Sequence, residues 1–316
     1  MPTITQLEYI VTVDRLKHFG KAALHCHVSQ PSLSMQIQKV EYEIGFPIFD
    51  RLKKPILPTQ KGVRFIEQAK VVLKENEKLL ALTKKDEKAI SGDFKLAIIP
   101  TIAPYLLPLF IESFSVNYPK VKLKIDELKT ETIIEDLKSD QLDAALLATP
   151  LNEPSLKETP LYYEPFYLYV GKDHPFAARK SIKESDLDGS DMWLLQDGHC
   201  LRNQVVKICS IKNEKGVFKN ISFEGGNLET LKYLVQNSKS YTLIPELFVH
   251  TLSEQERKLY VKEITQPTPH REVSLVSRRD QWKSDILLAL EETLLSHIPK
   301  NLPLKLKQKK SQLVGI

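Results

Sequence analysis

The chain has 316 residues, of which 42% are hydrophobic and 27% charged, and this is long enough for two or three domains of an ordinary globular protein. No apolar stretch is long enough to cross a bilayer, the start lacks a signal-peptide pattern, and three cysteines are too few for a disulfide framework, so we expect a cytoplasmic protein with free thiols and no membrane partner. The net charge of +5 is uneven, because residues 1–90 carry +5 and residues 91–299 carry −5, which favours a polyanion as the partner of the N-terminal part.

Helical periodicity dominates the start of the chain. Ile4 to Leu16 has the spacing of an amphipathic helix, and a short helix is expected from about Phe19 to Cys26. A turn with Ser29 or Gln30 at the cap position and Pro31 in the first turn predicts a third helix that ends near Ile44. Phe46 to Pro58 then favours a β-ribbon. Two helices joined by a tight turn and followed by a basic wing predict a winged helix-turn-helix over residues 1–58.

The third helix has one apolar face and one polar face. Leu33, Ile37 and Val40 face the expected core, so the opposite face is free to contact base edges in a major groove. The candidate base contacts are Gln30, Ser32, Ser34, Met35, Gln36 and Gln38, and the candidate phosphate contacts in the ribbon are Arg51, Lys53 and Lys54. The same pattern also fits an ordinary solvated helix face.

A long charged helix is expected over residues 59–90. Its apolar line of Ile66, Ala69, Leu73 and Leu80 is typical of a helix that pairs with a second copy of itself. Beyond it, strand and helix patterns alternate, which indicates an α/β fold. We expect one subdomain over residues 91–164 and 268–300, a second over 165–267, and a flexible basic tail over 301–316.

The first α/β subdomain begins with a strand, helix, strand, helix, strand pattern. The expected elements are Phe94–Pro100, Pro104–Asn117, Val121–Leu128, Thr132–Lys138 and Asp143–Ala148. Thr101 and Thr130 follow the first two strands. In an open α/β sheet such strand ends face a ligand crevice. Thr130 could equally be a turn residue beside Thr132, because Thr132 and Glu135 have the spacing of a capping box.

Two cysteines carry the clearest chemical signal. Cys200 lies in the run Asp197-Gly198-His199-Cys200-Leu201-Arg202-Asn203, where a histidine, an arginine and a helix start could each favour the thiolate. Cys209 follows nine residues later. If the segment is helical, the two Cα atoms lie roughly 13 Å apart, whereas a disulfide needs less than about 7 Å.

The segment between the cysteines is a weak helix former, with three β-branched residues and no alanine. A helix of this kind can act as a bistable element. We therefore expect peroxide to oxidise Cys200 to a sulfenic acid, which Cys209 resolves to a disulfide when the segment unwinds. The alternative is that Cys200 is a buried, inert thiol.

The N-terminal sequence resembles that of LysR-type transcriptional regulators. The matching residues include His18-Phe19-Gly20-Lys21-Ala22-Ala23, Val28-Ser29-Gln30-Pro31-Ser32, Phe49-Asp50-Arg51 and Thr59-Gln60-Lys61-Gly62. The resemblance implies a winged helix-turn-helix, a dimerising linker helix and a two-lobed effector domain like a periplasmic binding protein.

The rest of the chain is similar to the hydrogen-peroxide-sensing members of that family. The resemblance is carried by Ile99-Pro100-Thr101, Pro104-Tyr105-Leu106-Leu107-Pro108, Leu228-Glu229-Thr230-Leu231 and the cysteine segment. It implies that Cys200 is the peroxidatic and Cys209 the resolving cysteine, and that Thr101, Thr130, His199, Arg202 and Asn203 surround the peroxide. Asn203 stands where an aspartate is common, and Ser238-Lys239-Ser240-Tyr241 stands where glycine-containing sequence is usual.

These observations predict a transcriptional regulator, mainly an activator of oxidative-stress genes, and not an enzyme. We expect no cofactor and no metal, with hydrogen peroxide as the signal. The expected partners are double-stranded DNA, RNA polymerase, further copies in a homodimer or homotetramer, and a thiol reductant such as glutaredoxin or thioredoxin. Two alternatives remain: a LysR-type regulator that binds a small organic anion in the effector crevice, and a thiol peroxidase fused to a DNA-binding domain.

Overall fold

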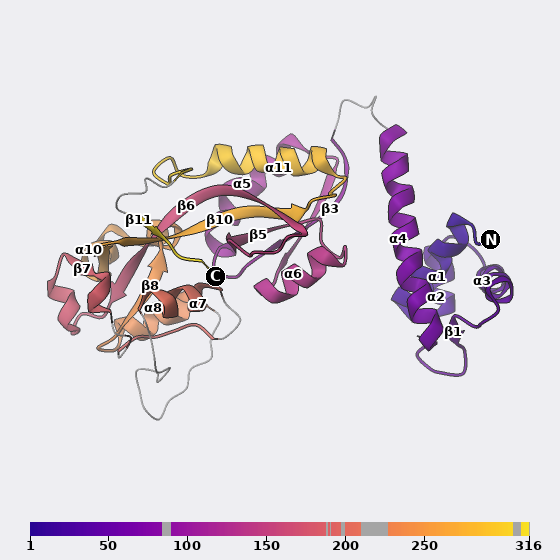
Figure 1. The fold of residues 1–316 in the computed structure, drawn as a ribbon, viewed down its shortest axis with the longest axis horizontal. Helices are drawn as coiled ribbons and strands as arrows, with labels where there is room; N and C mark the ends of the chain where they lie inside the picture. The colour runs from indigo at the N-terminus through magenta and orange to yellow at the C-terminus, as the bar shows by residue number, and fades with distance from the viewer. Residues whose placement is uncertain are drawn as a thin grey trace. The chain divides into compact units, whose positions relative to one another are not determined.

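The structure, a computed structural model, describes residues 1–83, 90–187, 189, 191–196, 200–209, 227–305 and 311–315. The chain divides into two compact units, Met1–Lys88 and Ala89–Ile316, which are coloured in chain order in Figure 1. Within the described ranges, no helix is both long enough and apolar enough to cross a membrane.

The first unit is built from helices whose ends follow local sequence signals. The helices are α1 (Ile4–Leu16), α2 (Phe19–His25) and α3 (Gln30–Ile44). The side chain of Ser29 caps α3 by accepting a hydrogen bond from the backbone of Ser32, and Gly45 ends the helix with a φ of 77°. The helix-turn-helix expected from the sequence is therefore present.

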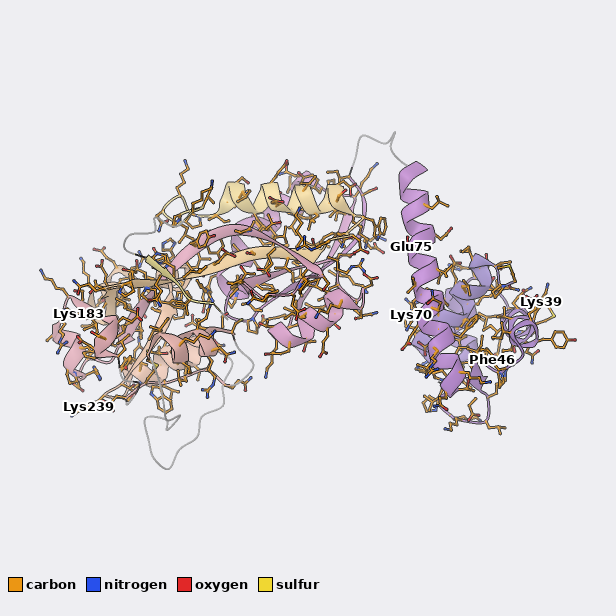
Figure 2. All side chains as sticks on the ribbon, in the orientation of Figure 1. Lys39, Phe46, Lys70, Glu75, Lys183 and Lys239 are labelled. Carbon is orange, nitrogen blue, oxygen red and sulfur yellow. The ribbon has the colours of Figure 1, made fainter. Side chains whose placement is uncertain are left out.

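The wing is shorter than the predicted ribbon. Its strands β1 (Phe49–Asp50) and β2 (Leu57–Pro58) pair antiparallel. The chain then enters α4 (Gln60–Thr83), whose Lys70, labelled in Figure 2, pairs with Asp14 of α1 at 3.2 Å. In the expected apolar line of this helix, Ile66 and Ala69 are buried in the first unit.

The second unit is organised around a mixed nine-stranded sheet. Its path runs β4-β3-β5-β10-β6-β9-β7, with β8 paired to β6 and β11 paired to β10. The strands are β3 (Gly92–Ile98), β4 (Val121–Glu127), β5 (Ala144–Thr149), β6 (Leu156–Val170), β7 (Ser181–Lys183), β8 (Tyr241–Pro245), β9 (Val261–Thr265), β10 (Thr268–Arg278) and β11 (Ser311–Leu313). The early strands β3, β4 and β5 are parallel, whereas β10 runs antiparallel to both β5 and β6.

Two long strands, β6 and β10, connect the two halves of this unit. The first part of β6, up to Pro165, pairs with β10, and the part from Phe166 onward pairs with β8. The helices are α5 (Ala103–Asn117), α6 (Thr130–Lys138), α7 (Cys200–Ile208), α8 (Leu228–Gln236), α9 (Glu246–Thr251), α10 (Glu254–Tyr260) and α11 (Ser284–His297), with short 3₁₀ turns at Pro175–Ala178 and Glu184–Asp186. Figure 1 shows α5 beside α11 on one face of the sheet, with α6 across the other.

Two further expectations differ from this structure. The helix predicted to begin at Thr132 begins at Thr130, and Thr132 makes no capping box, because Lys129 is the residue that precedes the first turn. Within the tail expected to be flexible, Ser311–Leu313 pair in parallel with Thr268–His270. Val314 is only 6% exposed and belongs to the hydrophobic core of the second unit.

Candidate redox site and DNA-binding surface

The sulfur of Cys200 lies at the meeting point of two helix N-termini. Cys200 is the first residue of α7, Thr130 is the first residue of α6, and the Thr130 hydroxyl oxygen is 2.9 Å from the sulfur. Both side chains are buried, Cys200 at 3% and Thr130 at 5% exposure. Since a helix N-terminus carries partial positive charge, the two helices together favour negative charge at this sulfur.

A buried ion pair lies on the sheet next to the thiol. The guanidinium of Arg271 on β10 donates to Glu164 on β6 at 2.7 Å, and neither side chain is exposed to solvent. The same guanidinium donates to the hydroxyl and to the carbonyl of Thr101, each at 3.3 Å. Thr101 follows β3, so the ion pair joins the strand ends to the centre of the sheet.

The electrostatics of Cys200 combine opposing effects. Burial raises the pKa of the Cys200 thiol above its ordinary value, whereas the hydrogen bond with Thr130, the positive charge of Arg271 and the backbone amide at the helix start lower the pKa. The net direction is upward. The thiol is therefore protonated in the resting protein. Thr130, Arg271 and the helix start stabilise the thiolate once the proton has left.

Cys209 lies at the far end of the same helix. Its backbone amide donates to the carbonyl of Val205, so the helical path continues to this residue, and its side chain is 1% exposed. Both cysteines are thiols. With a rise of about 1.5 Å per residue their Cα atoms are roughly 13 Å apart, beyond the reach of a disulfide. A bond between them requires α7 to unwind.

The residues near Cys200 in sequence are not all near it in space. Arg202 is half-buried and donates to the carbonyl of Leu195 at 3.1 Å, and Asn203 is exposed on the outer face of α7. The positive charge that acts on the thiol is that of Arg271, 71 residues further along the chain. The structure thus brings Thr101 and Thr130 to the site but not Asn203, and His199 lies outside the described residues.

Sequence reasoning missed two buried polar residues of this site. Arg271 is one, and Gln204, one helical turn beyond Cys200, is the other. The side-chain oxygen of Gln204 has no hydrogen-bond partner within the described ranges. Two sequence signals could have identified them. Arg271 is a charged residue within an otherwise buried strand, and Gln204 is a glutamine on the apolar face of a helix.

The unusual serine segment has a packing role. Trp193 donates its indole N–H to the hydroxyl of Ser238 at 3.3 Å, and that hydroxyl donates to the carbonyl of Leu234 at 2.7 Å. Ser240 is fully buried beside it. These contacts fix the chain between α8 and β8.

The polar face of α3 is only partly available to a ligand. Gln30, Met35 and Gln38 are exposed, with Met35 at 61%. Ser32, Ser34 and Gln36 are half-buried, and Gln36 accepts a hydrogen bond from Gln6 of α1 at 2.8 Å. The most accessible positions lie at the start and along one edge of the helix.

Arg51 is tied to its own unit. Its guanidinium donates to Ser34 at 3.0 Å and to Glu41 at 2.9 Å, and it lies over the ring of Phe19. Glu41 in turn accepts from the backbone amides of Ile48 and Phe49. Arg51 and Glu41 therefore hold the wing against α3, and a contact between Arg51 and a DNA phosphate stays a prediction.

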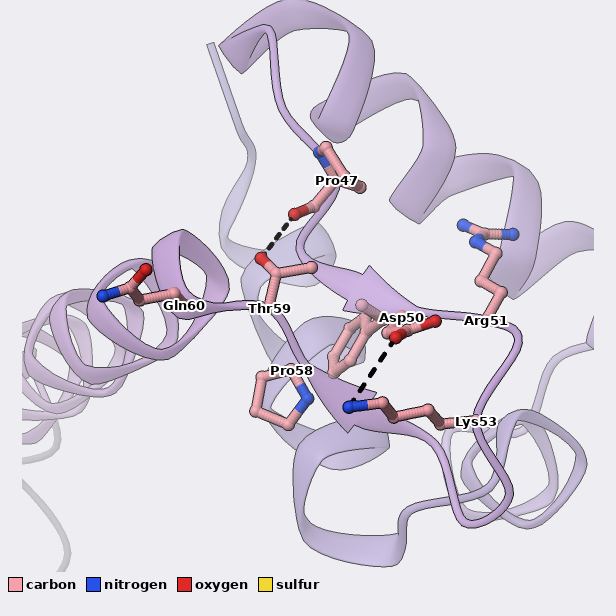
Figure 3. Close-up of a pocket in the computed structure, with 8 residues that line it drawn as sticks. Pro47, Asp50, Arg51, Lys53, Pro58, Thr59 and Gln60 are labelled. Carbon is pink, nitrogen blue, oxygen red and sulfur yellow. Dashed lines mark hydrogen bonds and ion pairs between the residues drawn. The ribbon is translucent and has the colours of Figure 1, made fainter.

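Beside this clamp lies an open pocket of about 490 Å³, shown in Figure 3. Lys53 reaches across it toward Asp50 at 4.0 Å and remains 62% exposed. Two other residues that line the pocket are joined, because the Thr59 hydroxyl donates to the carbonyl of Pro47 at 2.8 Å. Lys53 and the exposed Lys54 are thus the cations of the wing that remain open to solvent.

Comparison with known proteins gives consistent results. Residues 4–63 match the bacterial regulatory helix-turn-helix protein family of the lysR type, and residues 87–299 match the LysR substrate binding domain. A hydrogen peroxide-inducible genes activator of Pectobacterium carotovorum is 37% identical over 93% of this chain and 96% of its own.

Solved structures of similar proteins give the same result as the sequence comparisons. A full-length OxyR cysteine variant from Pseudomonas aeruginosa has a TM-score of 0.74 and 31% identity, covering 93% of this chain and 98% of that one. A hydrogen-peroxide-bound OxyR mutant from Corynebacterium glutamicum has a TM-score of 0.61 and 30% identity, covering 94% and 92%.

Proposed function

The chain belongs to the LysR family of DNA-binding transcriptional regulators, and we propose that it senses hydrogen peroxide through Cys200 and Cys209. The observation that carries this proposal is the placement of a buried thiol against Thr130, at two helix N-termini and near Arg271, with a second thiol at the other end of the same helix. The reactive thiol and its resolving partner are thus held apart at rest.

The proposed reaction consists of two substitutions at sulfur. The Cys200 thiolate attacks one peroxide oxygen, the O–O bond breaks, and the leaving hydroxide takes up the thiol proton to become water. The Cys209 thiolate then attacks the sulfur of the Cys200 sulfenic acid, the S–S bond forms, the S–O bond breaks, and the leaving hydroxide takes up the Cys209 thiol proton to become a second water. Two thiols and one peroxide give one disulfide and two waters, and a dithiol reductant such as glutaredoxin or thioredoxin returns the two electrons and two protons.

The residues around the thiol have distinct roles in this proposal. Thr130 donates to the thiolate, and Arg271 stabilises its charge while the guanidinium also fixes Thr101. His199 stays a proposed member of the pocket. The chemistry uses protein thiols alone and needs no cofactor.

The consequence of the disulfide is conformational. Because the bond cannot form while α7 is helical, it selects another arrangement of residues 199–220. We propose that this change re-spaces the DNA-binding units of a homodimer or homotetramer, and alters contact with RNA polymerase at oxidative-stress genes in the cytoplasm. Each oxidation event persists until a reductant resets it, and steady multiple turnover of peroxide at rates useful for detoxification would instead favour a thiol peroxidase.

A peroxide titration with thiol mapping tests the proposal. Tryptic peptides are analysed by mass spectrometry before and after brief peroxide exposure, together with a footprint on target DNA. Wild type should give the Cys200–Cys209 disulfide and a changed footprint, and Cys209→Ser should give neither, while Cys26→Ser is the matched control. A footprint that responds to peroxide equally in Cys209→Ser would refute the switch, and a thermal shift with organic anions but not with peroxide would favour a metabolite sensor.

A further inference from the structure

The C-terminal segment is built into the core of the second unit. Ser311–Leu313 extend the sheet beside the start of β10, and the amide of Val314 donates to the carbonyl of His270 at 2.9 Å. Val314 is buried, whereas the neighbouring Leu313 is 40% exposed. The segment is thus anchored by backbone pairing on one side and by one apolar side chain.

The same segment holds the helix between the two cysteines. The side-chain amide of Gln204 donates to the carbonyl of Val314 at 2.9 Å, and the ammonium of Lys207 donates to the carbonyl of Gly315 at 3.1 Å. Gln204 is fully buried, so losing its partner would leave a buried donor unsatisfied. Both contacts fall within the stretch that must unwind before Cys200 and Cys209 can join.

We propose that residues 311–315 act as a brace that holds α7 helical and thereby sets how readily the disulfide closes. This inference rests on the proposed function and deepens it by naming a regulatory element of the same switch. The helix has β-branched Val205, Val206 and Ile208 and little intrinsic stability, so its persistence depends on packing and on such contacts. The brace favours the reduced form, because its hydrogen bonds to α7 are lost when the helix unwinds.

The brace acts on the second chemical step and not on the first. Attack on peroxide needs only the sulfur of Cys200 and its surroundings at the start of α7. Resolution by Cys209 needs the helix to open, which breaks the contacts of Gln204 and Lys207. Loosening the brace should therefore speed disulfide closure and favour the disulfide at equilibrium, while the rate of sulfenic acid formation stays the same.

Two matched substitutions in one segment test this. Val314→Asp places a charge at the buried anchor and should release the segment, while Leu313→Asp places the same charge at the exposed neighbour and should leave it docked. The rate of Cys200–Cys209 disulfide closure is followed after mixing with peroxide, and the rate of sulfenic acid formation is measured with a dimedone-type trap. The thiol–disulfide equilibrium is measured in glutathione buffers. Truncation after Lys305 is the second releasing variant, and it introduces no buried charge.

We expect Val314→Asp and the truncation to close the disulfide about tenfold faster and to shift the thiol–disulfide equilibrium about tenfold toward the disulfide, which is about 30 mV. Hydrogen exchange of the α7 amides in the reduced protein should also accelerate. The brace would be overturned if Val314→Asp and the truncation matched Leu313→Asp in the closure rate, in the thiol–disulfide equilibrium and in hydrogen exchange. Hydrogen exchange needs no peroxide, so it separates this failure from the absence of any Cys200–Cys209 disulfide in wild type, which would instead refute the peroxide proposal.

Discussion

The Cys200 sulfur and the Thr130 hydroxyl lie 2.9 Å apart, although 70 residues separate them in the chain. The contact joins the first turns of α6 and α7, and through it the thiol is tied to the half of the sheet that carries β3, β4 and β5. The reactivity of the thiol therefore depends on how α6 and α7 are packed, and not only on the sequence around Cys200.

Thr130→Val should slow the reaction of Cys200 with peroxide. The substitution keeps the shape of the side chain but removes the hydrogen bond that lowers the pKa of Cys200, so the thiolate becomes rarer at neutral pH. Losing one hydrogen bond to a charged group predicts a rate about 10-fold lower. The rate is measured by stopped flow in a Cys209→Ser background. Thr132→Val, exposed on the same helix, is the control and should leave the rate unchanged.

The pH dependence of that rate follows from the raised pKa of Cys200. Because burial raises the pKa above its ordinary value of 9.0, the thiolate fraction should increase about tenfold per pH unit from pH 6 to about 9 without a plateau. A plateau near neutral pH would contradict the protonated resting thiol. The pH–rate profile of the Cys209→Ser variant distinguishes a continued rise in rate from a plateau.

The same shift makes stability depend on pH. A thiol whose pKa is higher in the folded than in the unfolded protein contributes stability that is fully present below the unfolded pKa. That contribution is lost as pH rises through the folded pKa. Reduced protein should therefore lose stability above about pH 9, and Cys200→Ser should lose less over the same range. Urea unfolding at pH 8 and pH 10 measures the difference.

Arg271→Met should destabilise the second unit strongly. It leaves the carboxylate of Glu164 buried without its partner, which typically costs about 3–5 kcal/mol. Adding Glu164→Met removes the unpaired charge and should restore most of the stability, though not the peroxide rate, because the positive charge near Cys200 stays absent. Urea unfolding and the peroxide rate are measured on both variants. Equal stability of the single and double variants would contradict the pairing.

How much the sequence could predict depended on how local each signal was. The ends of α1 and α3 were predictable because caps such as Ser29 and Gly45 act within a few residues. The start of α6 was misplaced because Thr132 and Glu135 have the spacing of a capping box, yet the helix begins where Thr130 meets Cys200. That contact is tertiary, so no local spacing rule reports it.

Other features could not be read from the chain because their partners are distant. Arg271 contacts Thr101 across 170 residues, and no spacing rule connects them. The lysine-rich composition of the tail suggested a solvated end, whereas Val314 is buried in the core and Ser311–Leu313 pair with β10. Arg51 is a candidate phosphate contact because it is basic and lies in the wing. Its pairing with Glu41 and Ser34 depends on the packed domain.

Arg51 and Lys53 should differ in their effect on DNA binding. Lys53→Met removes an exposed cation, so binding should weaken to a similar extent on all sequences and the salt dependence should fall by about one unit of slope. Arg51→Met frees Glu41 and loosens the wing, so it should also lower the unfolding temperature of the first unit. DNA-binding titrations at several salt concentrations, together with thermal unfolding, distinguish the effect of Lys53→Met from that of Arg51→Met. Equal unfolding temperatures would show that Arg51 is not a clamp.

Gly62→Ala should disrupt the join between the wing and α4. A Cβ at this position would lie 2.0 Å from the backbone carbonyl oxygen of Ile48, and a backbone atom cannot rotate away as a side chain can. The carbonyl already accepts the amide of Thr59, so relief of the clash must shift β1 or the start of α4. Overpacking of this kind costs about 1–3 kcal/mol, so the unfolding temperature of the first unit and its DNA affinity should both fall. Lys61→Ala, exposed one residue earlier, is the control for unfolding, and equal unfolding temperatures of Gly62→Ala and Lys61→Ala would contradict the clash.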